Sequence, residues 1–363
     1  MTCLLSHDLK GAEDAFDGAL AIAHDLGSHR DEAWAMWHLA ELSFYGNRVD
    51  EAEERLGRAE EAFRSAGDTG GIGWVRGLLG YVRLAQGRRI EAESLALSIV
   101  DEVRDRGDRW ASAMTLVLLA TVRLWEGRAE QAVDGATEAL KLFSEINDHD
   151  GLMRGTATLA RALAACGRVE EARSVVDDPT GLAAVAVATH LGDWRTVLAA
   201  RQSDLELIAA EAAVTAAFAL LQAGQVEEAL SLLEEPSPSP YHRAVLSLAL
   251  VSGRDPDRAL DSADAALDAR PEATYRDAAF AHLAQGFAQL QLGRLGQARE
   301  AIVAARRSVA PTDDVVTTAV VELGAARLER NDDSVSAALK NLESMGVPTD
   351  GWETLLRTAA GDY

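Results

Sequence analysis

The amino-acid sequence predicts an all-α protein in which repeated antiparallel helix pairs stack into a superhelical solenoid. Alanine and leucine are abundant, only eight prolines occur in 363 residues, and long alternating β-branched runs are missing. A six-residue motif also recurs, and its last residue returns every forty residues as Ala12, Ala52, Ala92, Ala132 and Ala172. Because such helix pairs cannot bury their apolar faces alone, they must stack, and we expect about nine to ten pairs.

The clearest copy of the recurring motif is GRVEEA at 167–172, and we name it the elbow motif. Its other copies are NRVDEA (47–52), GRRIEA (87–92), GRAEQA (127–132), GQVEEA (224–229) and GRLGQA (293–298). A second column keeps the same spacing and holds only residues that tolerate a left-handed backbone: Gly27, Gly67, Gly107 and Asn147. The acids that follow, Asp68, Asp108 and Asp148, are expected to cap the next helix.

Two helical windows lie between these turns in each repeat. In the second repeat we expect helix A over about 30–46 and helix B over about 49–66. Helix A carries a leucine column, each member followed by a small residue that lets helix B approach: Leu39, Leu79, Leu119 and Leu159, then Ala40, Gly80, Ala120 and Ala160. Helix B has apolar residues at three- and four-residue steps, which predicts one buried stripe.

The regular spacing ends after Val176. The next clear closing alanine is Ala229, with a short motif, GDWRTVLA, between them at 192–199. The segment EPSPSP at 235–240 cannot be helix interior, because proline removes amide donors and fixes φ. We therefore expect a stiff loop or hinge there.

The register then returns through Ala259, Ala298 and Ala338, and an amphipathic helix after Pro348 is expected to cap the array. This pattern divides the chain into three parts. They are regular repeats at 1–176, irregular repeats ending in the proline-rich loop at 177–240, and C-terminal repeats with a capping helix at 241–363.

The net charge of −23 argues against nucleic acid as a direct partner, because 58 acidic against 35 basic residues repel a phosphate backbone. Cys3 and Cys166 cannot form a disulfide framework, so a reducing cytoplasm fits best. The start MTCLL lacks a basic leader, and no stretch is long and apolar enough to cross a bilayer. We expect a cytoplasmic chain without a membrane partner.

The strongest catalytic signatures are absent: there is no GxxxxGK[ST], HExxH or GxSxG. The glycine-rich stretch at 70–77 lies inside an expected helix with no strand before it. Asn147, Asp148, His149 and Asp150 could attract a cation, although a single loop of this composition is usually a solvated turn. The histidines are scattered, without an acid and a nucleophile at a recurrent spacing. We predict no catalytic residue, metal or cofactor.

One stripe of helix A, opposite Leu39 and Ala40, is the strongest candidate for a ligand site. Along successive repeats it carries Trp34, Trp37, Glu41, Tyr45, Trp74, Tyr81, Trp110, Met114, Trp125, Arg154 and Arg161. Aromatic rings offer a large rigid contact area, and arginine pairs with carboxylates. In the alternative interpretation, these side chains fill the gaps between successive helices A. Trp194 and Trp352 lie outside the stripe.

The repeat unit resembles the tetratricopeptide repeat. The shared features are a leucine followed by a small residue, a glycine seven or eight residues later, and the elbow motif with its alanine. The unit has forty residues rather than the usual thirty-four, and a Gly-Asp or Asn-Asp pair replaces the helix-ending proline. The resemblance is close to about Val176 and looser afterwards. It implies a right-handed superhelix whose helices A line a concave groove, with five of the seven tryptophans along it.

The chain also resembles the helical-repeat sensor arm of large ATP-dependent LuxR-type bacterial transcription regulators, in its period and its acidic, Ala/Arg/Glu-rich composition. That family joins a nucleotide-binding module, an inducer-sensing arm and a DNA-binding helix-turn-helix, but this chain lacks the phosphate loop and any recognisable DNA-reading segment. The resemblance implies a non-catalytic arm that binds a peptide, a protein segment or an apolar small molecule. A free-standing adaptor and an enzyme on a helical-repeat scaffold are the alternatives.

The first repeat lacks room for its helix A, because only residues 1–7 precede its helix B at 9–26. We therefore expect a segment of a longer protein or a chain whose first helix stands alone. The uncovered face of that helix would favour end-to-end self-association.

Overall fold

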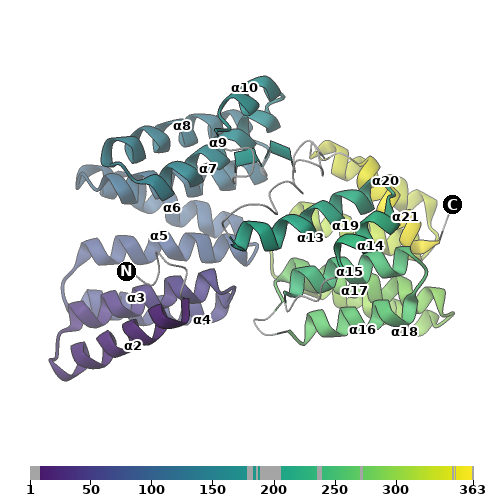
Figure 1. Cartoon of the computed structure of the whole chain (residues 1–363), viewed down its shortest axis with the longest axis horizontal. Helices are drawn as coiled ribbons and strands as arrows, with labels where there is room; N and C mark the ends of the chain where they lie inside the picture. Colours follow the sequence, from purple (N-terminus) through teal and green to yellow (C-terminus); the bar gives the residue numbers. More distant parts are fainter. Residues whose placement is uncertain are drawn as a thin grey trace.

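The computed structural model describes two stacks of α-helices. It describes residues 9–177, 183–184, 187–188, 206–234, 239–269, 273–345, 347 and 349–361, and these ranges contain eighteen helices and no strand. Figure 1 shows a first array, α2 to α10, beside a second array, α13 to α21. The predicted all-α helical-repeat solenoid is confirmed for this part of the chain.

The first array consists of a single helix followed by four helix pairs. The single helix is α2 (Leu9–Asp25), and the pairs are α3 (His29–Tyr45) with α4 (Val49–Ser65), α5 (Thr69–Ala85) with α6 (Arg89–Asp105), α7 (Arg109–Trp125) with α8 (Ala129–Ile146), and α9 (His149–Ala165) with α10 (Val169–Ser174). The windows predicted for the second repeat agree with α3 and α4 to within one residue at each end.

The turn columns have the backbone conformation that their residues predict. The φ values of Gly27, Gly67, Gly107 and Asn147 are 64°, 66°, 72° and 53°. The predicted caps are confirmed as well, because the carboxylates of Asp68, Asp108 and Asp148 accept hydrogen bonds from the N–H groups of Gly71, Ala111 and Gly151. A left-handed residue therefore ends one helix, and an acid starts the next.

The closing alanines of the elbow motif lie where paired helices cross, and Ala52, Ala92, Ala132 and Ala172 are fully buried. The small residues of helix A also permit close packing. At Gly80 a Cβ atom would lie 2.5 Å from Leu118 Cδ2, so an alanine there would force Leu118 to move.

The second array consists of four pairs and a last helix. The pairs are α13 (Glu206–Gln222) with α14 (Val226–Leu232), α15 (Pro240–Ser252) with α16 (Pro256–Leu267), α17 (Tyr275–Gln291) with α18 (Leu295–Val309), and α19 (Val315–Leu328) with α20 (Asp332–Ser344); the last helix is α21 (Asp350–Ala360). Pro240 lies in the first turn of α15, where it costs no hydrogen bond. The remaining hinge residues 235–238 and the motif at 192–199 lie outside the described residues.

Each array curves with the first helix of every pair on its inner side. Successive first helices touch, as in α3 with α5, α5 with α7 and α7 with α9, whereas contacts of this extent are missing between successive second helices of the described residues. We call the first helices the inner helices. None of the described helices combines the length and the apolar character that a membrane span demands.

The last helix, α21, does not cap the end of the array as the sequence predicts. It packs against α13, α15, α17 and α19, which are the inner helices of the second array. Leu355, Leu356 and Ala359 are buried there, and the Trp352 ring lies 5.4 Å from that of Phe218. The reason is that α21 is strongly amphipathic, so its apolar face gains more burial across four inner helices than on one terminal pair.

Candidate functional site

Four tryptophans of the predicted stripe form a continuous row on the inner helices of the first array. The ring centroids of Trp34 and Trp37 on α3 lie 5.7 and 5.3 Å from that of Trp74 on α5. Trp74 in turn stacks on Trp110 of α7 at 4.5 Å. Edge-to-face and stacked geometries of this kind are favourable between aromatic rings. The row therefore links three successive repeats.

The members of this row differ in their accessibility. Trp37 is only 5% exposed, and its buried Nε1 has no hydrogen-bond partner. Trp34, Trp74 and Trp110 are half-buried against apolar side chains, and Nε1 of Trp74 donates to Asp108 Oδ2 at 3.2 Å. Trp37 thus fills the space between helices, while Trp34, Trp74 and Trp110 remain partly exposed.

Farther along the same inner side, α3 and α9 meet across the curve of the array. The Tyr45 hydroxyl lies 3.3 Å from Glu41 Oε1 and 3.3 Å from a guanidinium nitrogen of Arg154. The guanidinium carbon of Arg154 is also 5.6 Å from the centre of the Tyr45 ring. On α5, Tyr81 donates its hydroxyl hydrogen to the backbone carbonyl of Met114 at 2.9 Å. Residues three repeats apart therefore share one local site.

Arg161 lies two helical turns beyond Arg154 on α9. It has no ion-pair or hydrogen-bond partner among the described residues. Its side chain reaches solvent, yet desolvation by the surrounding protein lowers its pKa. Burial likewise raises the pKa of Tyr45 and of Tyr81, although neither ring is fully covered. All four residues stand on inner helices of the first array, Tyr45 on α3, Tyr81 on α5, and Arg154 and Arg161 on α9. We call Tyr45, Tyr81, Arg154 and Arg161 the recess.

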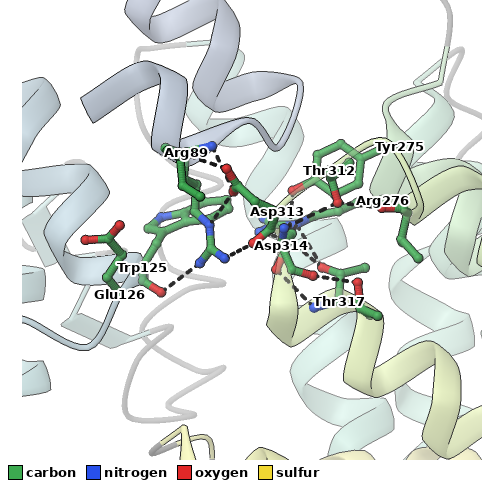
Figure 2. A network of polar contacts seen from close by, with 12 residues as sticks. Arg89, Trp125, Glu126, Tyr275, Arg276, Thr312, Asp313, Asp314 and Thr317 are labelled. Atoms are coloured by element: carbon green, nitrogen blue, oxygen red, sulfur yellow. Dashed lines mark hydrogen bonds and ion pairs between the residues drawn. The ribbon is translucent and has the colours of Figure 1, made fainter. Parts of the chain in front are cut away.

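Trp125 lies apart from the row and the recess. It is the last residue of α7, and its ring lies 4.0 Å from the guanidinium carbon of Arg276 in the second array. Its carbonyl oxygen accepts a hydrogen bond from Arg89 at 3.0 Å. Figure 2 shows Trp125 at the place where the two arrays meet.

The sequence interpretation missed the residues that join the arrays: Arg89, Arg276, Asp313 and Asp314. A signal was available at Arg89, because every other copy of the elbow motif has an apolar residue at this position, namely Val49, Ala129, Val169, Val226 or Leu295. A charged residue in an apolar column indicates that the repeat contacts something other than its neighbour. Asp314 follows Ala298 by sixteen residues, as the capping acid Asp68 follows Ala52, so the sequence marks it as a helix cap but not as a partner of Arg276. Asp313 precedes it at the turn position, and nothing in the sequence marked it as a contact of the first array.

The described residues include no cluster of three or more His, Cys, Asp or Glu side chains that could hold a metal ion. Asp148 caps α9, and Asn147 has the left-handed conformation of the turn before it. Asp148 therefore has a structural role at the start of α9. Trp194 lies outside the described residues.

Comparisons with known proteins give one regulatory relative and several helical structures. No family model matches the chain. Over 158 residues, 44% of the chain, it is 29% identical to the regulatory protein AfsR of Streptomyces coelicolor, and it covers 16% of the length of AfsR. The apo form of the quorum sensor NprR from B. thuringiensis aligns over 93% of this chain and 99% of that chain, with 11% identity and a TM-score of 0.43.

The APC/C hetero-tetramer Cut9–Hcn1 aligns over 98% of this chain and 74% of that chain, with 12% identity and a TM-score of 0.38. Alignments with TM-scores this low carry no argument about function. The chain also corresponds to less than a fifth of AfsR. What this chain binds must therefore be argued from its own residues.

Proposed function

We propose that the chain is a non-catalytic ligand-binding module of tetratricopeptide-like repeats, acting as the sensor or scaffold arm of a bacterial transcription regulator in the cytoplasm. The similarity to the regulatory protein AfsR supports the regulatory context. The curved helical array supports binding through the inner side, because solenoids present extended concave surfaces. DNA binding and ATP hydrolysis are not part of this proposal.

The first array is the better place for the ligand. In the second array, the inner helices contact α21, so this side is covered by the chain itself. In the first array, the inner helices carry the tryptophan row, three of whose members are half-buried, and the recess. The observation that carries the proposal is Arg161, an arginine on an inner helix of an acidic protein with no acidic partner among the described residues.

The chemistry of the recess favours a ligand with a carboxylate beside an apolar group. A guanidinium without an acidic partner gains from charge-assisted hydrogen bonds to a ligand, and its planar fork matches a carboxylate. Tyr45, Tyr81 and Phe44 supply an apolar wall, since the Phe44 ring lies 6.1 and 6.5 Å from the two tyrosine rings. A peptide with a free C-terminus, a protein segment or an acidic small molecule would satisfy both requirements.

The test uses pairs of peptides with the same sequence, one ending in a free carboxylate and the other in an amide. A preference for the free acid would support a carboxylate ligand. Fluorescence and thermal-shift titrations should show at least about tenfold tighter binding of the free acids, because a charge-assisted hydrogen bond is lost with the amide. Arg161→Gln should remove this preference, whereas Arg307→Gln, an exposed arginine on the outer helix α18, should retain it. Equal affinity for both peptides in the unmodified protein, or an unchanged preference in Arg161→Gln, would overturn the assignment.

Self-association through the first repeat remains a proposal of its own. Near the end of α2, Ile22 and Leu26 are 63% and 76% exposed. Such apolar side chains at the end of an array would suit contact with a second copy. The light-scattering mass of the protein should then rise with concentration.

A further inference from the structure

We propose that the two arrays are joined by a releasable latch. One side of the latch is the turn at 87–90 with Trp125, and the other is Tyr275, Arg276 and the segment 312–314. The structure holds the closed form, and in the open form both arrays stay folded while these contacts separate. The proposal concerns the shape of the chain and does not depend on any ligand of the recess.

Asp313 is the centre of the latch (Figure 2). Its carboxylate accepts hydrogen bonds from the backbone N–H groups of Arg89 and Ile90, both at 2.8 Å, and from Arg89 Nε at 3.0 Å. Its own N–H donates to the carbonyl of Gly87 at 2.9 Å, and its carbonyl accepts from the Arg89 guanidinium. Arg88, the residue before α6, provides no side-chain cap. Asp313 therefore caps α6 from the other array.

A second group of contacts surrounds Asp314, which is 1% exposed. Its carboxylate caps α19 through the N–H of Thr317 at 3.0 Å and accepts hydrogen bonds from Arg276 at 2.8 Å and the Tyr275 hydroxyl at 2.7 Å. The guanidinium of Arg276 then covers the ring of Trp125 in a cation–π contact. In this second group only the Arg276–Trp125 contact crosses between the arrays, because Asp314 finds its partners within the second array. The groups that need the closed latch, or water in place of the partner, are therefore those of the Arg89–Asp313 contact.

The described residues at this junction share no apolar core. Each apolar cluster combines side chains from one array and none from the other. Among the helices that the structure describes, none of the first array packs extensively along one of the second. A small polar contact between folded parts permits relative motion, because water can satisfy the separated groups, whereas opening an apolar core exposes surface that water cannot satisfy. The contact can therefore open while both arrays stay folded, which is what we mean by a latch.

Gly87 offers a matched way to open it. Its φ is +75°, and an added Cβ atom would lie 2.8 Å from Tyr275 Cζ and 2.9 Å from Thr312 Cβ. Gly127 occupies the same position one repeat later with a φ of +73°, and nothing lies within 4 Å of its added Cβ atom. Alanine has a similar backbone cost at both positions. Only Gly87→Ala also presses the second array away from the first.

The test uses the whole chain without ligand. Small-angle scattering should show a larger radius of gyration for Gly87→Ala than for Gly127→Ala, while circular dichroism shows the same helix content for both. Asp313→Asn should expand the chain in the same way and should speed amide exchange at Arg89 and Ile90 by about tenfold or more, because the cap of α6 is weakened. Asp255→Asn is its control, since Asp255 caps α16 within one array.

Two outcomes would overturn the latch. Identical scattering of Gly87→Ala and Gly127→Ala would mean that the contact does not hold the arrays in place. Loss of helix in Gly87→Ala but not in Gly127→Ala would mean that the junction belongs to one folding unit and cannot open by itself. Neither outcome bears on the peptide preference of Arg161, so the two proposals fail independently.

Discussion

The two arrays are built from the same helix pair but use their inner sides differently. In the first array the inner side carries the tryptophan row and the recess, and its buried apolar residues fall into several clusters. In the second array α21 crosses four inner helices, and one apolar cluster extends from Val214 to Ala360. A solenoid whose repeats contact only their neighbours unfolds in steps, whereas a helix laid across the repeats joins them into one unit. The inner helices of the second array are thus covered by the chain's own last helix, whereas those of the first array keep partly exposed aromatic side chains.

The largest effects should come from two core substitutions. They should cost similar stability but raise hydrogen exchange over different lengths of the chain. Phe143→Ala in the first array and Leu356→Ala in α21 each remove a side chain that is almost fully buried, and each should cost about 3 to 5 kcal/mol. Hydrogen exchange should rise mainly in α7 to α9 for Phe143→Ala, but throughout α13 to α20 for Leu356→Ala.

Leu295→Ala, at a position 56% exposed, is the control for general loss of a leucine. If exchange in Leu356→Ala rose only within α21, the helix would be a passive cover and the comparison between the arrays would fail.

A smaller effect is expected at Asp314, whose ion pair with Arg276 lies within the second array, directly beside the contact between the arrays. Burial raises the pKa of its carboxyl, but Arg276 and the hydrogen bonds from Thr317 outweigh burial and hold the pKa at about 2. A lowered pKa contributes stability that is present above the ordinary value of 3.8 and is lost as the pH falls through about 2.

Between pH 7 and pH 2, Asp314→Asn should therefore lose about 2 kcal/mol less of its unfolding free energy than the unmodified protein. Urea unfolding at a series of pH values measures this difference. An identical pH dependence in both proteins would show that Arg276 does not stabilise the ionised carboxylate.

The smallest effect should distinguish the turns of the two arrays. The first array places only glycine or asparagine at its left-handed turn positions, whereas the second has Arg254 and Arg330, with φ values of 67° and 53°, beside Gly224 and Gly293. Because a side chain is strained in this conformation, Arg330→Gly should stabilise the protein by about 0.5 to 1 kcal/mol. Thermal unfolding measures the shift, and Gly293→Ala, at a φ of +74° with open space around it, should give a shift in the opposite direction.

Much of the fold was predictable because its signals are local. The turn columns, the capping acids and the helix bounds of the first array depend on residues within one repeat, where glycine geometry, N-capping and apolar spacing act directly. The stripe residues Trp34, Trp74 and Trp110 came together for the same reason, since they stand at comparable positions of successive inner helices. The domain boundaries at 176 and 240 stay a prediction, although residues on both sides of 240 share one apolar cluster.

By itself, the sequence determined the repeat, its turns and which helix side is apolar. Only the tertiary structure decided that Tyr45 meets Arg154, that Trp125 leaves the stripe to contact Arg276, that Asp313 caps α6 and that α21 lies inside the second array. The physical reason is that a solenoid's curvature accumulates from a small rotation at each repeat. Residues several repeats apart meet only after these rotations add up, and no local spacing in the sequence records their sum.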